Sequence, residues 1–126
     1  MENNNIKSDE FEPTSIKECS DHYILAVNDT MNVLQGKWKI PIIAILLYGK
    51  KRFGELERAI PKINPRMLSK ELRDLEANGI VERTVYATIP VSVEYKLTQS
   101  GELFSGVLDV MLQWGLQHRK NTLKDK

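Results

Sequence analysis

The chain has 126 residues, of which 41% are hydrophobic and 28% are charged, values typical of one soluble domain with a hydrophobic core. No run of about 18 apolar residues occurs, which argues against a membrane span. The net charge of +1 is unevenly spread along the chain. Residues 1–30 hold two basic and seven acidic side chains, whereas residues 50–83 hold nine basic and six acidic ones. This asymmetry favours an anionic partner for the middle of the chain.

Residues 1–15 are polar, acidic and without apolar periodicity, so we predict a flexible arm there. This start is typical of neither a secretory signal nor a transit peptide. The single cysteine, Cys19, excludes an internal disulfide framework and favours a reducing compartment. We therefore expect a cytoplasmic protein.

Two helices are predicted next. Residues 20–34 begin with good N-cap types and continue with apolar residues at helical spacing until Gly36. The apolar run of residues 37–49 is longer than a typical strand and predicts a buried helix. Pro41 fits this helix if it lies in the first turn, where its missing N–H costs nothing.

The following segment predicts a helix-turn-helix. Residues 50–60 carry apolar residues at helical spacing and end at a proline, which indicates a short amphipathic helix. Asn64 is a good N-cap, Pro65 suits the first helical position, and Gly79 suits the C′ position after the helix end. A second helix over residues 65–78 then follows the first across a turn of a few residues.

This second helix has two unlike sides. At about 100° per residue, Leu68, Leu72 and Leu75 share a narrow sector. The opposite side carries Arg66, Ser69, Lys70 and Arg73. Either this side is an ordinary solvated helix face, or it binds a polyanion.

Residues 80–86 and 92–97 alternate with period two around a short loop, which predicts a β-hairpin. The apolar residues that should face the core are Val81, Val85, Val93, Tyr95 and Leu97. Val81 then lies opposite Leu97, and Glu82 lies opposite Lys96 on the outer side. The same register puts Arg83 on the inner side, so its head group must reach an edge.

After Thr98 as N-cap, a last helix is predicted through about Arg119. Its apolar stripe is wider than a helix of a small domain needs to cover one side of a core. The stripe consists of Leu103, Phe104, Val107, Leu108, Met111, Leu112 and Trp114.

A helix-turn-helix followed by a hairpin is the winged-helix arrangement, in which the second helix enters the DNA major groove. The motifs GKW, RF-x-EL, ML-x-x-x-L-x-x-L, GIVER, VEY-x-LT-x-x-G and WG resemble, in order and spacing, those of the HxlR-type transcriptional regulators, relatives of the MarR group. The resemblance covers about residues 19–115. We expect a mainly α fold with a small β-hairpin.

The resemblance implies a dimeric, bacterial DNA-binding regulator whose first and last helices form the dimer interface. It suggests an arm over residues 1–15 and one winged-helix domain over 16–126. Within this domain we expect the helix-turn-helix at about 52–78, the wing at about 80–97 and the dimerisation helix at about 99–119. The interface residues that we expect are Tyr23, Ile24, Val107, Leu108, Met111 and Trp114.

Double-stranded DNA with a pseudo-palindromic operator is the expected partner, with half-sites about one helical turn apart. The family usually has a basic residue just before VEY, whereas Ser92 stands here and the loop of residues 87–91 has no cation. We therefore expect a weak wing contact and more weight on the recognition helix and the cations that precede the first helix. The expected DNA-contacting residues are Arg66, Ser69, Lys70, Arg73, Lys51 and Arg52, with Thr88, Pro90 and Ser92 in the wing.

Cys19 has two interpretations. It directly precedes a helix start, where N–H groups favour a thiolate, and some relatives in the family sense oxidants or electrophiles with a cysteine in this region. However, Ser20 follows it instead of the usual proline, and the nearby Glu18 and Asp21 would raise the pKa of the thiol. The cysteine is therefore either an unreactive residue at a dimer surface or a redox sensor.

The sequence gives little support for a metal site or for an enzymatic active site. His22 and His118 are far apart in sequence and no metal-ligand spacing occurs. Neither a nucleophile elbow nor a Gly-rich phosphate loop is present, so we expect no cofactor and no enzymatic activity. Two alternatives remain: a winged-helix protein-interaction module whose basic side only aids solubility, and a regulator gated by an unidentified small molecule.

Overall fold

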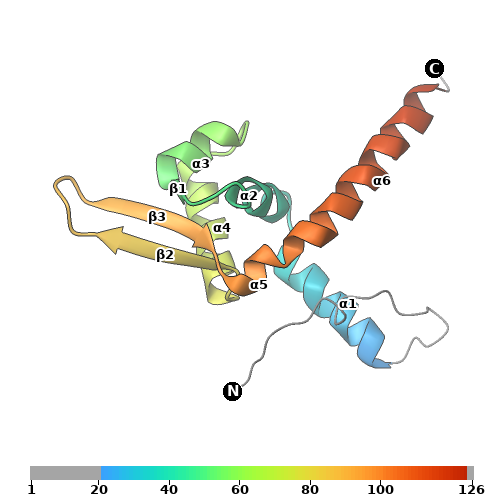
Figure 1. Ribbon diagram of the computed structural model, residues 1–126, viewed down its shortest axis with the longest axis horizontal. Coiled ribbons are helices and arrows are strands. Elements are labelled where there is room, and N and C mark those ends of the chain that lie inside the picture. Colours follow the sequence, from blue (N-terminus) through green and yellow to red (C-terminus); the bar gives the residue numbers. More distant parts are fainter. Residues whose placement is uncertain (1–20, 125–126) are drawn as a thin grey trace. The chain divides into compact units, whose positions relative to one another are not determined.

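The structure is a computed structural model that describes residues 21–124, so the predicted arm and Cys19 lie outside the described residues (Figure 1). It is mainly helical with one three-stranded antiparallel sheet. None of the described helices is both long and apolar enough to cross a membrane. The elements are α1 (Asp21–Leu34), α2 (Lys39–Leu46), β1 (Lys51–Arg52), α3 (Phe53–Ala59), α4 (Pro65–Ala77), β2 (Val81–Tyr86), β3 (Ser92–Leu97), α5 (Gln99–Glu102) and α6 (Phe104–Lys124).

The described residues belong to two units, divided between Asn32 and Val33. The first unit contains most of α1. This amphipathic helix exposes large apolar side chains, Ile24 and Met31 among them. The second unit holds every other element and the hydrophobic core.

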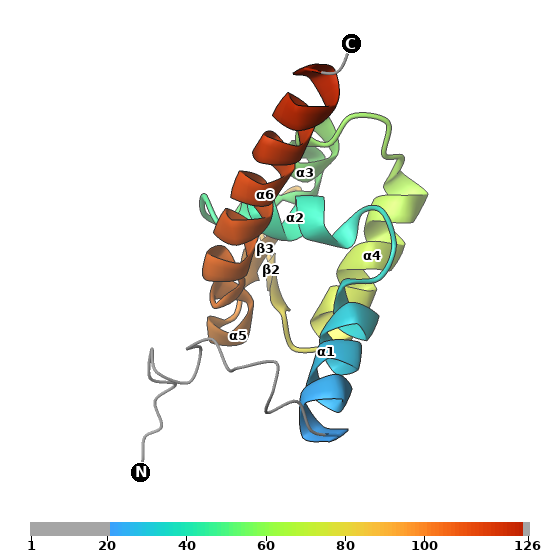
Figure 2. The same ribbon diagram turned by 90° about the vertical axis from the view of Figure 1, so that its right-hand side faces the viewer.

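The core of the second unit lies between α2, α3, α4 and one side of the sheet. Figures 1 and 2 show α2 between α4 and α6. Helix α2 is apolar all round, as expected of a helix that neighbours cover, and Pro41 lies in its first turn as predicted. The fully buried side chains are Ile42, Ile43, Leu56, Leu68, Leu72, Leu75 and Val81.

The hairpin register is the predicted one: Val81 pairs with Leu97 and Glu82 with Lys96. The expectation that Val85 faces the core was wrong: this residue, near the loop end of β2, is 50% exposed, and only Val81 of that strand is buried. The predicted hairpin is also incomplete. A third strand, β1, pairs with β3 and gives the sheet order β1-β3-β2.

Strand β1 corrects the prediction that a helix starts at residue 50. Gly49 adopts a positive φ of 127°, which turns the chain out of a helical path. Arg52 is extended, and its backbone N–H donates to the Glu55 carboxylate at 2.8 Å, which caps α3 at Phe53. Residues 51–52 are therefore free to pair with the exposed edge of β3.

Helix α4 has the predicted ends. The Asn64 side chain accepts a hydrogen bond from the Met67 N–H at 2.8 Å, and Pro65 occupies the first helical position. At the other end Gly79 has a φ of 74°, and the Ile80 N–H donates to the Leu75 carbonyl at 2.9 Å. This is a Schellman ending, so α4 stops where the hairpin must begin.

The single C-terminal helix that was predicted is in fact two. Thr98 caps only α5, accepting a hydrogen bond from the Gly101 N–H at 3.1 Å, and the helical pattern is interrupted at Leu103. Helix α5 is held against the hairpin, since a Cβ on Gly101 would lie only 2.4 Å from the Ile80 carbonyl oxygen. Helix α6 then continues to Lys124, beyond the predicted end at Arg119.

A buried ion pair connects α2 to α4. The Lys39 ammonium donates to the Glu71 carboxylate, and only 4% of Lys39 and 8% of Glu71 are exposed. Asp74 lies 3.3 Å from the same ammonium. Burial alone lowers the pKa of Lys39, but the hydrogen bonds and charges of Glu71 and Asp74 outweigh it and raise the pKa above its ordinary value. Lys39 therefore stays charged and fixes the position of α4 on α2.

Replacing Lys39 by Met leaves the Glu71 carboxylate buried without its partner. We expect the free energy of unfolding, measured by urea denaturation, to fall by about 3–5 kcal/mol. The double variant Lys39→Met/Glu71→Leu removes both charges and should recover most of this loss. Lys37→Met is the matched control: its exposed ammonium lies 4.9 Å from the Trp38 ring, and its loss should cost about 1 kcal/mol or less. Equal losses at both lysines would contradict this account.

Candidate nucleic-acid interface

The predicted contact residues of α4 lie together on its outer side. Leu68, Leu72 and Leu75 are fully buried on the opposite side, so the helix cannot rotate without exposing them. The outer side consists of Arg66, Lys70 and Arg73, which are exposed, and Ser69, which is half-buried.

Two internal contacts order this outer side. The Arg73 guanidinium donates to the Ser69 hydroxyl at 3.1 Å. The Lys70 ammonium lies 3.2 Å from the Asp74 carboxylate, one helical turn away. Within residues 21–124, Arg66 makes no ion pair, so its five N–H donors are available to a ligand.

Asp74 joins the buried pair to the outer side, because it contacts both Lys70 and Lys39. The hydrogen bond from Lys70 is the main cause that lowers the pKa of Asp74 below its ordinary value of 3.8; partial burial opposes this shift, and Lys39 adds to it. Asp74 is therefore ionised at neutral pH and offsets part of the positive charge of the outer side.

A fifth residue, Arg83, extends the cationic surface from α4 to the hairpin. A groove of about 300 Å³ lies between α4 and the sheet. Its lining consists of Ser69, Leu72, Arg73, Glu76, Arg83 and Tyr95, so two cations and one carboxylate face it. Arg83 lies on the inner side of β2, as the register predicted, and its side chain is exposed. Arg83 was not among the predicted contact residues, although its predicted place on the inner side of the hairpin, with a head group that must reach an edge, was the signal that could have identified it.

The two cations predicted before the first helix of the motif lie at the other edge of the sheet. Lys51 is half-buried and pairs with Tyr95, whereas Arg52 is exposed and pairs with Glu94. Lys50 is 3.4 Å from the Glu94 carboxylate. Arg52 is thus the more accessible of the two predicted residues, and the structure separates both of them from the cations of α4.

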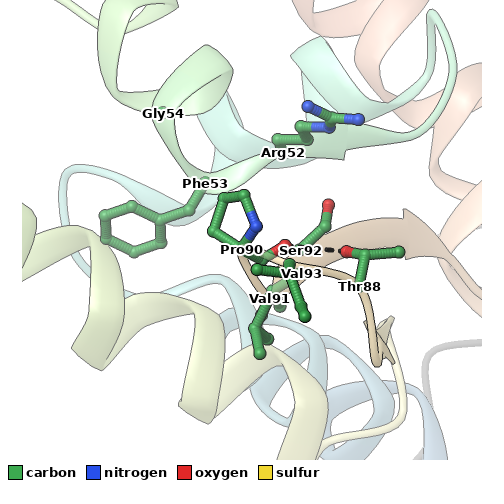
Figure 3. A pocket seen from close by; sticks show the side chains of 9 residues that line it. Arg52, Phe53, Gly54, Thr88, Pro90, Val91, Ser92 and Val93 are labelled. Carbon is green, nitrogen blue, oxygen red and sulfur yellow. Dashed lines mark hydrogen bonds between the residues drawn. The ribbon is translucent and has the colours of Figure 1, made fainter.

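The wing loop joins Tyr86 to Ser92. Within it the Thr88 hydroxyl donates to the Pro90 carbonyl at 2.7 Å. A pocket of about 610 Å³ lies between this loop and the β1–α3 junction, and Figure 3 shows the side chains of Arg52 and Phe53 beside those of the wing. Of the predicted wing residues, Thr88 and Pro90 are exposed and Ser92 is half-buried.

The residues that were predicted to form a dimer interface are largely uncovered. Tyr23, Ile24, Val107, Met111 and Trp114 are exposed large apolar side chains, and the Trp114 ring stacks on His118 with centroids 4.8 Å apart. Leu108 differs from them, because it is half-buried and packs against the core of its own chain.

Comparisons with known proteins gave a matching family, similar relatives and similar structures. Residues 33–123 match the HxlR-like helix-turn-helix family. The HTH-type transcriptional regulator YtcD of Bacillus subtilis is 44% identical over 96 residues, which cover 76% of each chain. The structure of the redox regulator HypR in its reduced form superposes with a TM-score of 0.73 at 42% identity, covering 80% of this chain and 99% of that one. Diamide-treated YodB from B. subtilis gives a TM-score of 0.62 at 36% identity, covering 79% and 95%.

The lowered pKa of Asp74 predicts a pH-dependent contribution to stability. A carboxyl group whose pKa is lower in the folded state stabilises the fold above its unfolded pKa, near 3.8, and this stabilisation is lost as the pH falls through the folded value. Asp74→Asn should therefore reduce the free energy of unfolding at neutral pH, with a difference from the wild type that shrinks below about pH 3.8. In a Lys70→Met background the substitution should cost less. A difference that is constant from acid to neutral pH would contradict the assignment.

Proposed function

The chain belongs to the HxlR-like helix-turn-helix family, and on that premise we propose that it is a dimeric DNA-binding regulator of transcription. The observation that carries the proposal is the exposed cationic side of α4, held outward by a fully buried leucine stripe. In a winged helix this is the helix that enters the major groove. The proposal places the protein in the cytoplasm and includes no enzymatic activity.

Within the proposed complex, the cations of α4 and the hairpin contact different parts of the DNA. Arg66 lies in the first turn of α4, whose residues approach base edges, and its guanidinium can donate to O6 and N7 of one guanine. Arg73 and Arg83 line a groove between helix and hairpin together with Glu76, and because the two guanidinium groups outnumber the one carboxylate we assign them to the phosphate backbone. Lys70 shares Asp74 with the core, so it contributes less charge to DNA than its exposure suggests.

The proposed dimer follows from the uncovered apolar surfaces of α1 and α6. A monomeric soluble protein rarely exposes so many large apolar side chains along two helices. A symmetric pair would cover them and present two copies of α4, which read half-sites about 34–36 Å apart. The operator is therefore proposed to be pseudo-palindromic.

We further propose that Cys19 makes the regulator responsive to oxidants. The supporting observation is that HypR and YodB, both more than 30% identical to this chain, are described as a redox regulator and as a diamide-treated transcriptional regulator. Since the chain has one cysteine, diamide can oxidise two Cys19 thiols of different subunits to one disulfide and is itself reduced to the hydrazine. With a small thiol present, a mixed disulfide is the other product.

Salt dependence tests DNA binding and the assignment of Arg83. For a pool of random-sequence duplexes, log Kobs should fall linearly with log salt concentration, and Arg83→Ala should make the slope shallower by about 0.9. The affinity of Arg66→Ala for a duplex selected from that pool should fall by about 1–3 kcal/mol. Arg119→Ala, an exposed cation on α6, serves as the control that should change neither quantity. Binding that is absent at low salt, or independent of salt, would favour the protein-interaction module instead.

Treatment with diamide tests the role of Cys19. We expect the oxidised wild type to differ from the reduced protein at least several-fold in its affinity for a selected duplex, and to return to the reduced value after treatment with dithiothreitol. Cys19→Ser should bind DNA like the reduced wild type and should not respond to diamide. Unchanged affinity of a protein whose Cys19 is fully oxidised, as verified by mass spectrometry, would exclude the sensor.

A further inference from the structure

A groove of about 490 Å³ lies between α2 and α6, two helices that Figures 1 and 2 both show next to each other. This size is in the range of small-molecule sites, which is about 300–1,000 Å³. Most of the lining is apolar and consists of Ile40, Ala44 and Leu47 from α2 and its C-cap, with Leu108, Met111 and Leu112 from α6. The groove is therefore suited to an organic molecule with an apolar body.

The polar part of the lining consists of Tyr48, Ser105 and Asp109. Asp109 is the only charged residue among the described residues that line the groove, and within residues 21–124 it makes no ion pair. Ser105 precedes Asp109 by four positions, so both lie on the same side of α6. The groove thus has a carboxylate without a counter-ion, which favours a positively charged ligand over an anion.

Tyr48 contributes an aromatic ring from the α2 side of the groove. Its backbone N–H donates to the Ile45 carbonyl at 3.1 Å, so the last turn of α2 holds the position of the residue. Tyr48 is nevertheless 89% exposed, which leaves its ring free to contact a ligand. The face of an aromatic ring attracts an ammonium group that lies within about 6 Å. Tyr48 and Asp109 therefore favour the same charge from the two helices that form the groove.

The side of α6 that lines the groove differs from the side that exposes the largest apolar residues. The groove side consists of Ser105, Leu108, Asp109 and Leu112, which span a sector of about 100° at roughly 100° per residue. The exposed residues Val107, Val110 and Trp114 gather on about the opposite side. A dimer that forms through these three residues leaves the groove open to a ligand.

We propose that the groove is an effector site for an organic cation, with an ammonium group beside Asp109 and Tyr48 and an apolar body against the leucines. This inference deepens the proposed function by naming the chemical class of a regulating ligand, and its effect on DNA binding rests on that function. Burial of the apolar body supplies most of the affinity. The exposed carboxylate and the ring add selectivity for the charge.

The position of the groove connects it to DNA binding. Helix α2 is joined to α4 by the buried pair of Lys39 and Glu71, and α6 carries apolar surface that we assign to the dimer. A ligand that contacts both α2 and α6 fixes the angle between them and thereby the spacing of the two copies of α4. The ligand should therefore change the affinity for a duplex with two half-sites but not for a duplex with one.

Three probes that share a naphthalene ring test the site: naphthylethylammonium, naphthylethanol and naphthylacetate. Their affinities for the full-length protein would be measured by isothermal titration calorimetry at physiological salt. The ammonium probe is expected to bind about threefold to tenfold more tightly than the alcohol, because it gains an exposed ion pair and a cation–π contact. The carboxylate probe should bind most weakly, since Asp109 repels it.

Two variants and a control assign the selectivity to named residues. Asp109→Asn keeps the shape of the side chain and should remove most of the preference for the ammonium probe over the alcohol. Tyr48→Leu should reduce the same preference by the part that the ring supplies. Glu102→Gln, which removes an exposed carboxylate outside the groove, should match the wild type. Saturating ammonium probe should also change the affinity for a selected two-half-site duplex several-fold.

Three results would overturn the effector site: equal binding of the three probes, selectivity that Asp109→Asn leaves unchanged, or an ammonium probe that binds without altering the affinity for the two-half-site duplex. If no probe binds and Asp109→Asn alters the oligomeric state measured by light scattering, a second copy of the chain occupies the groove instead. A wild type that binds the ammonium probe but no duplex at low salt would contradict the proposed function and the regulatory role, and would leave the cation site standing.

Discussion

The arrangement of the whole site depends on one buried salt bridge, between Lys39 of α2 and Glu71 of α4. An ion pair in a core contributes little net stability, because desolvation of the two charges offsets their attraction. Its value lies in geometry: an ammonium and a carboxylate that are both buried must stay in contact, whereas leucines can slide against one another. The leucine stripe sets which side of α4 faces the core, and the salt bridge adds a directional contact that fixes the position of α4 on α2.

Three residues of α4 connect the buried salt bridge to the exposed surface of the helix. Glu71 is buried, Asp74 lies at the boundary and contacts Lys39 as well as Lys70, and Lys70 itself is exposed. Arg66 and Arg73 continue the outer side toward the proposed duplex. A cationic helix face is useful for reading a base sequence only if its direction is fixed, and here that direction is set by buried leucines and a buried ion pair that the duplex does not reach.

Much of this could be predicted from the sequence, since local signals were strong and consistent. The Asn64 cap, the Gly79 ending and the leucine spacing predicted α4, and the alternation of apolar residues predicted the register of the hairpin. The main misses depend on contacts between distant segments. Strand β1 exists because β3 offers it an edge, the break after α5 accompanies the packing of Gly101 on Ile80, and Lys39 finds Glu71 across 32 positions of the chain. Arg83 was correctly oriented by the register, but its place beside Arg73 required the fold.

If the leucine side of α4 stays in the core while its outer side meets DNA, a nuclear magnetic resonance titration should distinguish the two sides. Isotopically labelled protein would be titrated at low ionic strength with a duplex selected from a random-sequence pool. We expect the guanidinium Nε–H signals of Arg66, Arg73 and Arg83 to shift together, while the methyl signals of Leu68, Leu72 and Leu75 remain in place. Arginine signals that do not move, or leucine methyl signals that shift as strongly as the arginines, would contradict it.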